Sequence, residues 1–191
     1  MIIKKLCTGL CLVGLVTPAF GAGPANSAVV SALNNTLAYT GSITDPERLS
    51  QWVMRTAPRL ARLIPNVFYR VRLLTLIYRE AQRARLEPDL VVAVIQVESA
   101  FDRKAVSRTG ALGLMQVKPF WIKELGHPED NLFDVATNLR YGCAILRHYL
   151  DLSGNRLTDA LAYYNGTFGE TEYPRKVFVA LGDRWGVLRR R

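Results

Sequence analysis

Apolar residues recur every three or four positions along most of the chain, which is the period of an amphipathic α-helix. The first such stretch covers residues 47–64, with apolar positions at Leu49, Val53, Leu60 and Ile64. Asp45 and Pro46 before it are typical of a helix start, because aspartate caps free N–H groups and proline fits the first turn. Pro58 predicts a kink or break within the stretch, and Pro65 separates it from the next helix.

The second stretch, residues 66–84, has an apolar face opposite a face of arginines. The apolar positions are Val67, Val71, Leu74 and Tyr78. We interpret these first two basic helices as a solvated scaffold. A third helix begins at Glu87, Pro88 and Asp89, and it carries the apolar run LVVAVIQV before Glu98.

Four more helices are expected after residue 118. The first is a short helix near Pro119 that buries Phe120, Trp121, Ile122 and Leu125. The next two cover residues 135–152, capped by Asp134, and 159–164, capped by Thr158. The last begins at Pro174 and is closed by Gly182. Residues 107–116, SRTGALGLMQ, predict a loop with one small hairpin at most. No segment shows the alternation of an extended sheet, so the predicted fold class is mainly α.

The N-terminus predicts a secretory signal peptide over residues 1–21. Lys4 and Lys5 precede the apolar run LCTGLCLVGLV, and small residues follow Pro18 at the spacing that a signal peptidase recognises. The apolar run is too short for a convincing membrane span, although a retained N-terminal anchor is the alternative. We therefore expect export to the bacterial periplasm. Residues 22–44 predict a loose leader of unknown role, and 45–191 a single domain with its catalytic core at about 85–180.

Composition narrows the classes of protein and of partner. The 191 residues are 49% hydrophobic and 21% charged, as in ordinary globular proteins, with a net charge of +9. This diffuse excess favours polyanionic surroundings, but no zinc pattern, phosphate-binding loop or basic helix indicates nucleic acid. Cys143 is the one cysteine after the signal peptide, so no intramolecular disulfide is expected. His127 and His148 are isolated, and we predict no metal site and no cofactor.

Glu98 is the main candidate for chemistry. It shares a helical stripe with Val91 and Ile95, on a helix that is apolar nearly all round, and it lies at the C-terminal end of that helix. Burial and the negative end of the helix dipole both disfavour the charged carboxylate, so both raise its pKa. A carboxyl group that stays protonated near neutral pH can act as a general acid. The alternative is a carboxylate held by an arginine or by backbone amides.

The segment that begins at Glu98 resembles the catalytic segment of the lytic transglycosylases with a goose-type lysozyme-like (SLT) domain. The matching motifs are Glu98-Ser99, Phe101, Ser107, Gly110-Ala111-Leu112-Gly113-Leu114-Met115-Gln116, Asn138 with Gly142, and Tyr163-Tyr164-Asn165-Gly166. The resemblance covers about residues 85–180. Two departures are Tyr163 in place of the usual Ala, and a Gly-Thr-Phe-Gly-Glu stretch from Gly166 in place of Ala-Gly-Pro-Gly. These departures affect the rim and length of a substrate loop rather than the acid.

The resemblance implies an enzyme that cleaves the β-1,4 bond between N-acetylmuramic acid and N-acetylglucosamine without water. Glu98 would protonate the leaving oxygen and then accept the proton of the C6 hydroxyl, which closes a 1,6-anhydro ring. Other glycosidases need a second carboxylate. None stands out here, because Asp102 is interpreted as a local cap or loop-fixing group, and Glu124, Asp130, Asp134 and Asp159 as caps or solvated charges.

The resemblance also implies a set of substrate-binding residues, each with a structural alternative. Ser107 would face the site or only start a turn, Met115 would form an apolar wall or pack in the core, and Gln116 would bind substrate or hold the loop. Tyr164 would place its hydroxyl next to Glu98 or pack in the core. Asn165 is expected to shape the loop, and Tyr173 to be an outer groove contact. The expected partner is the peptidoglycan glycan strand, with an envelope or secretion machinery as a second. Competing hypotheses are a hydrolytic muramidase of the same fold, a non-catalytic cell-wall adaptor and a basic membrane-surface protein.

Overall fold

The fold is that of a computed structural model, which describes residues 45–125 and 128–185. The elements in chain order are α2 (Pro46–Thr56), η1 (Ala57–Leu60), α3 (Val67–Arg83), α4 (Pro88–Ser99), α5 (Phe120–Leu125), α6 (Val135–Leu152), α7 (Leu157–Asn165), α8 (Glu172–Ala180) and η2 (Leu181–Trp185). The predicted signal peptide, the leader 22–44 and His127 lie outside the described residues. The mainly α prediction is confirmed.

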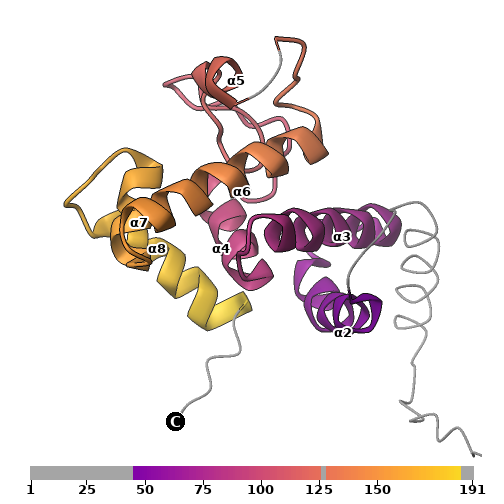
Figure 1. Cartoon of the computed structure of the whole chain (residues 1–191). Coiled ribbons are helices and arrows are strands. Elements are labelled where there is room, and N and C mark those ends of the chain that lie inside the picture. The colour runs from indigo at the N-terminus through magenta and orange to yellow at the C-terminus, as the bar shows by residue number, and fades with distance from the viewer. Residues whose placement is uncertain (1–44, 126–127, 186–191) are drawn as a thin grey trace, which may run out of the picture.

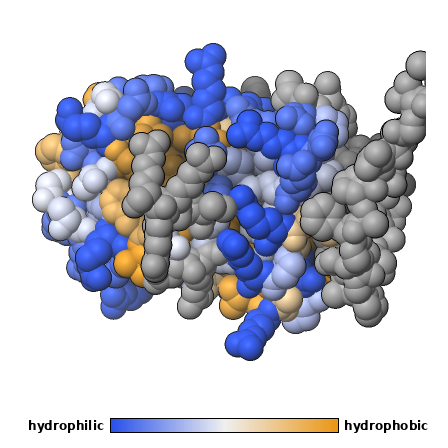
Figure 2. Space-filling model, turned by 90° about the horizontal axis from the view of Figure 1, so that it is seen from below, coloured by the Kyte–Doolittle hydropathy of each residue, from blue (hydrophilic) through white to orange (hydrophobic). Residues whose placement is uncertain are grey.

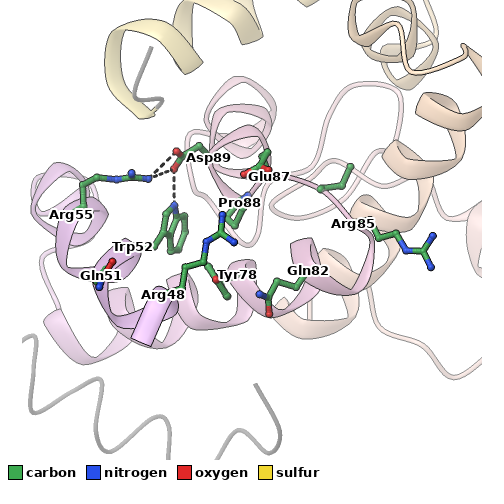
Figure 3. Close-up of a pocket in the computed structure, with 11 residues that line it drawn as sticks. Arg48, Gln51, Trp52, Arg55, Tyr78, Gln82, Arg85, Glu87, Pro88 and Asp89 are labelled. Carbon is green, nitrogen blue, oxygen red and sulfur yellow. Dashed lines mark hydrogen bonds and ion pairs between the residues drawn. The ribbon is translucent and has the colours of Figure 1, made fainter. Parts of the chain in front are cut away.

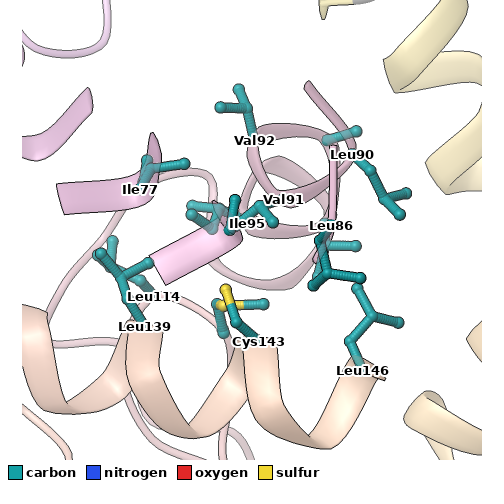
Figure 4. Packing of buried hydrophobic residues seen from close by; sticks show 14 of the residues in the cluster. Ile77, Leu86, Leu90, Val91, Val92, Ile95, Leu114, Leu139, Cys143 and Leu146 are labelled. Carbon is teal, nitrogen blue, oxygen red and sulfur yellow. The ribbon is translucent and has the colours of Figure 1, made fainter. Parts of the chain in front are cut away.

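Helix α4 lies in the middle of the domain, between α3 on one side and α8 with η2 on the other (Figure 1). Residues Leu90 to Ile95 of this helix are all buried. Helix α6 packs against α3 and α7, and its Cys143 faces α4 from inside the core (Figure 4). Each large apolar side chain buried in this way stabilises the fold by about 1.5–3 kcal/mol. The core therefore surrounds the middle of α4.

The predicted starts of several helices are confirmed. Asp45 accepts a hydrogen bond from the amide of Arg48 at 2.9 Å, with Pro46 in the first turn of α2. The helix gives way to the 3₁₀ turn η1, which contains Pro58, as the break predicted there requires. Asp134 caps α6 by accepting from the amide of Thr137 at 2.8 Å.

Two predicted helix limits are wrong. Thr158 does not cap α7, because the helix already begins at Leu157 with Arg156 as its extended N-cap. Gly182 does not close the last helix, since α8 continues directly into the π-helical turn η2. The buried Trp185 explains this extension: its Nε1 donates to Oε1 of Gln96 at 2.7 Å, so α4 holds η2 by a contact that no local signal encodes. Helix α8 also begins two residues before Pro174.

The predicted burial of α5 is correct only in part, because Trp121 and Ile122 are half-buried and pack against the core, whereas Phe120 and Leu125 do not. None of its residues is buried, and the side chains of Phe120 and Leu125 are 54% and 53% exposed. The predicted hairpin in the glycine loop is reduced to two isolated antiparallel bridges, Val106 with Leu112 and Leu112 with Val117, and no strand occurs in residues 45–125 or 128–185.

Hydrophilic side chains predominate over the described part of the face shown in Figure 2, with apolar residues in smaller patches. The described helices include none that is long and apolar enough to cross a membrane.

Candidate active site

Glu98 lies in the last turn of α4, one residue before the end of the helix. The helix ends because Ala100 and then Phe101 adopt left-handed backbone conformations, with φ of 49° and 70°. The Glu98 side chain is half-buried, and this burial raises its pKa to about 7, although a hydrogen bond from Tyr173 acts in the opposite direction. Among the described residues no arginine or lysine pairs with Glu98. The interpretation of Glu98 as part of an ion pair is therefore not supported.

The partner of Glu98 is Tyr173 of α8. Its hydroxyl donates to Oε1 of Glu98 at 2.6 Å, and its side chain is only 7% exposed. The prediction of an outer groove contact is wrong for this residue. Burial, with the charge of Glu98 second, raises the pKa of the Tyr173 phenol well above its usual value, so the phenol keeps its proton. The sequence offered no signal for this role, because it depends on the packing of α8 against α4.

The glycine loop is tied to the end of α4 and to α6. The hydroxyl of Ser99 donates to the carbonyl oxygen of Leu114 at 2.8 Å. From α6, the buried Asn138 accepts from the Met115 amide at 2.8 Å. Its Nδ2 donates to the carbonyl oxygens of Leu112 and Leu132 at 2.9 and 2.8 Å. The family motif includes Asn138, but the sequence did not indicate that its side chain holds the glycine loop. The hydrogen bond from Ser99 to this loop was not predicted either.

Two glycines permit this close packing. Gly113 has a φ of +72°, and a Cβ there would lie 2.5 Å from Nδ2 of Asn138. A Cβ on Gly142 of α6 would lie 2.4 Å from Sδ of Met115. Met115 itself is fully buried. Its side chain is thus part of the core, which matches the structural alternative to an apolar wall facing a sugar.

Three other predicted substrate-binding residues make contacts that shape loops. The Ser107 hydroxyl accepts from the Ala111 amide at 2.9 Å. The amide nitrogen of the Gln116 side chain donates to the carbonyl oxygens of Gly113 and Ala105 at 2.9 and 3.3 Å. Asn165 donates to the hydroxyl of Thr167 at 3.1 Å. For Ser107 and Gln116 these contacts match the structural alternative, and contact with substrate stays a prediction.

Tyr164 of α7 lies near Glu98 but is not bonded to it. Its hydroxyl donates to the carbonyl oxygen of Met115 at 2.8 Å. Burial raises the pKa of Tyr164 well above its usual value, and the charge of Glu98 is the second cause, which places the two groups within electrostatic range. Tyr164 therefore joins α7 to the glycine loop beside the acid.

The other carboxylates have local partners. Oδ1 of Asp102 accepts from the amide of Lys104 at 2.8 Å, so this residue fixes the turn after α4 as predicted. Asp130 accepts from the Tyr141 hydroxyl at 2.6 Å, and Asp159 pairs with Arg156. Within the described ranges, no group of three or more His, Cys, Asp or Glu side chains could hold a metal ion.

A cleft of about 640 Å³ lies at the opposite end of α4 and does not include Glu98. In it, Trp52 and Arg55 are both directed at Asp89 (Figure 3), which accepts from Trp52 Nε1 at 2.6 Å and pairs with Arg55 at 2.9 Å. Asp89 and Glu98 are separated by roughly 14 Å of helix, at about 1.5 Å of rise per residue. The two sites are thus distinct.

The Transglycosylase SLT domain family matches residues 75–178, which is more than half of the chain. The chain therefore belongs to this family, and the predicted SLT-type domain is confirmed. A transglycosylase of Enterobacteria phage PRD1 is 43% identical over 82 residues, which cover 43% of this chain and 30% of the phage protein. The membrane-bound lytic murein transglycosylase F of Desulfosudis oleivorans is 34% identical over 123 residues, covering 60% of this chain and 27% of that enzyme.

Among solved structures, the 70 kDa soluble lytic transglycosylase SLT70 from Escherichia coli aligns with a TM-score of 0.45 and 22% identity, over 83% of this chain and 24% of that one. This chain matches less than a third of the length of each of these two relatives and of SLT70.

Proposed function

We propose that this protein is a peptidoglycan lytic transglycosylase. It cleaves the β-1,4 bond between N-acetylmuramic acid and N-acetylglucosamine and leaves a 1,6-anhydro end. The observation that carries the proposal is Glu98, a half-buried carboxyl group with a pKa raised to about 7 and a tyrosine donor in place of a cation. Membership in the SLT family supports the same reaction.

The proposed reaction uses one carboxyl group twice. Protonated Glu98 donates its proton to the glycosidic oxygen as the C1–O bond breaks. The C6 hydroxyl of the same muramic acid then attacks C1, and the Glu98 carboxylate accepts the hydroxyl proton, which restores the acid. A pKa near 7 suits a group that must give and retake a proton near neutral pH. Tyr173 holds Oε1, so proton transfer is assigned to Oε2.

The partners of the other acids favour this reaction over hydrolysis. A retaining glycosidase needs a second carboxyl group about 5–5.5 Å from the first, and an inverting one needs it at roughly 6.5–9.5 Å. Asp102, the acid nearest to Glu98 in sequence, caps the next turn. Because the substrate supplies the attacking hydroxyl, the proposed mechanism requires no second carboxylate.

Its substrate is accordingly the glycan strand of the bacterial envelope. We place the protein in the periplasm, either released after removal of the signal peptide or attached through it. The relative from Desulfosudis oleivorans is a membrane-bound lytic murein transglycosylase, which supports a place in the envelope. An envelope or secretion machinery remains the second proposed partner.

The test is mass spectrometry of the fragments that the purified protein releases from isolated peptidoglycan. Anhydromuramic ends from the parent, and none from Glu98→Gln, are the expected result. Reducing ends would identify a hydrolytic muramidase instead. Binding without any release would identify a cell-wall adaptor.

A further inference from the structure

A row of aromatic rings runs from α6 to the loop after α7. Tyr149 of α6 stacks on Tyr163 of α7 with ring centroids 5.7 Å apart and an interplanar angle of 9°. Tyr163 stacks on Phe168, which follows α7, at 4.3 Å and 18°. On the other side, Trp121 of α5 contacts Tyr149 edge-on at 6.4 Å. Segments far apart in the chain thus bring their rings together.

The outer end of this row faces solvent. Phe168 is 63% exposed, on the loop between α7 and α8 that projects from the domain in Figure 1. Tyr163 and Tyr149 behind it are half-buried. A single exposed apolar residue is common in proteins. Here, however, two further rings stack behind the exposed one and hold it in place, which is typical of a binding surface.

The inner end of the row lies beside the candidate acid. Tyr163 is followed directly by Tyr164, whose hydroxyl holds the glycine loop at Met115. The neighbouring carbonyl oxygen, that of Leu114, accepts from the hydroxyl of Ser99, the residue after Glu98. The row therefore begins next to the reaction site and leads away from it.

We propose that Phe168, held from behind by Tyr163, stacks its solvent-facing side on a sugar ring of the glycan strand, at a subsite away from the bond that is cleaved. The C–H groups on one face of an N-acetylhexosamine ring are apolar and slightly positive, and the face of an aromatic ring is slightly negative. Both residues lie where the sequence departs from the motif pattern that it resembles, Tyr163 directly and Phe168 within the stretch that follows Gly166. This inference rests on the proposed function for the identity of the ligand.

The first experiment measures co-sedimentation with insoluble peptidoglycan at raised salt. It uses the Glu98→Gln protein, so that the glycan is not cleaved during the measurement. Adding Phe168→Ala or Tyr163→Ala should weaken binding by about 3- to 10-fold, the size expected for the loss of one aromatic contact. The control is Phe68→Ala, which removes a ring of similar exposure (56%) from α3. It should bind like the parent. Equal binding by all three variants would overturn the subsite.

A second variant at the same position tests whether weaker binding results only from misfolding of the loop. Phe168→Trp should retain binding, and its tryptophan emission should change when a soluble N-acetylglucosamine oligosaccharide is added. In the active enzyme, Phe168→Ala should raise KM for glycan and leave kcat nearly unchanged. An unchanged KM, with no emission change in Phe168→Trp, would assign the row to loop folding alone. If the parent releases no anhydro ends but Phe168→Ala still weakens binding, the proposed reaction fails and the subsite stands.

Discussion

The phenolic oxygen of Tyr173 lies 2.6 Å from Oε1 of Glu98, although the two residues are 75 positions apart in the chain. The contact forms where α8 packs on the C-terminal end of α4. Burial and this hydrogen bond act on the same carboxyl group in opposite directions. Burial has the larger effect, and the pKa of Glu98 is raised to about 7.

Glu98→Gln should fold and bind glycan but lose nearly all turnover, by roughly 10²–10⁴-fold, because the amide cannot give and retake a proton. In the parent, activity should fall as pH rises through about 7, since the proton needed for the first step is lost there. Release of anhydro-muropeptides against pH tests both statements. A folded variant that works at the parent's rate would refute the role of Glu98.

The same substitution should change how stability depends on pH. Between the ordinary glutamate pKa of 4.5 and about 7, Glu98 ionises in the unfolded chain but stays protonated in the folded one, so rising pH destabilises the parent. Glu98→Gln lacks this titration and should gain up to a few kcal/mol relative to the parent above pH 7, with little difference at acidic pH. Urea unfolding of both proteins at several pH values measures it. A loss of stability in the variant at neutral pH would contradict the raised pKa of Glu98 in the folded protein.

Tyr173→Phe should shift the alkaline fall of activity to higher pH. The hydrogen bond from Tyr173 lowers the pKa of Glu98, so its removal lets burial raise that pKa further. The pH profile of the variant is the measurement. Tyr164→Phe is the matched control, because its hydroxyl binds the Met115 carbonyl oxygen instead. It should reduce turnover through the loop without moving the profile. Identical shifts in both variants would contradict the assignment.

Asn138→Ala should reduce both stability and turnover, because it removes two hydrogen bonds to the glycine loop and a third to the carbonyl oxygen of Leu132. The expected loss in the free energy of unfolding is on the order of 3 kcal/mol, since buried loop groups are left without partners. Asn165→Ala removes an exposed amide that contacts Thr167 and should change stability little. Comparable stability of the two variants in urea would show that Asn138 does not carry the loop.

Gly142→Ala should destabilise the protein although alanine favours a helix by about 1 kcal/mol over glycine. The added methyl group would lie 2.4 Å from Sδ of Met115, and such overpacking costs about 1–3 kcal/mol. Met115→Val in the same protein should recover part of the loss by shortening the obstructing side chain. A more stable Gly142→Ala single variant would mean that Met115 moves freely.

The sequence by itself determined what depends on neighbours a few positions apart. Helix periods and caps such as Asp45 and Asp134 predicted the elements, because these signals act within one or two turns. The apolar surface of α4 on nearly every side likewise predicted that Glu98 would be buried and its pKa raised. The motif from Glu98 to Gly166 identified the family.

Only the tertiary structure decided which side chains meet across helices. Tyr173 became the donor to Glu98 rather than an outer contact, and Met115 filled the core against Gly142. Trp185 extended α8 past Gly182 by bonding Gln96. The reason is physical: periodicity states which face of a helix is apolar, but the approach of two faces depends on how all the helices fill the core together. Contacts between residues 75 or 89 positions apart are products of that packing, and no local pattern in the chain carries them.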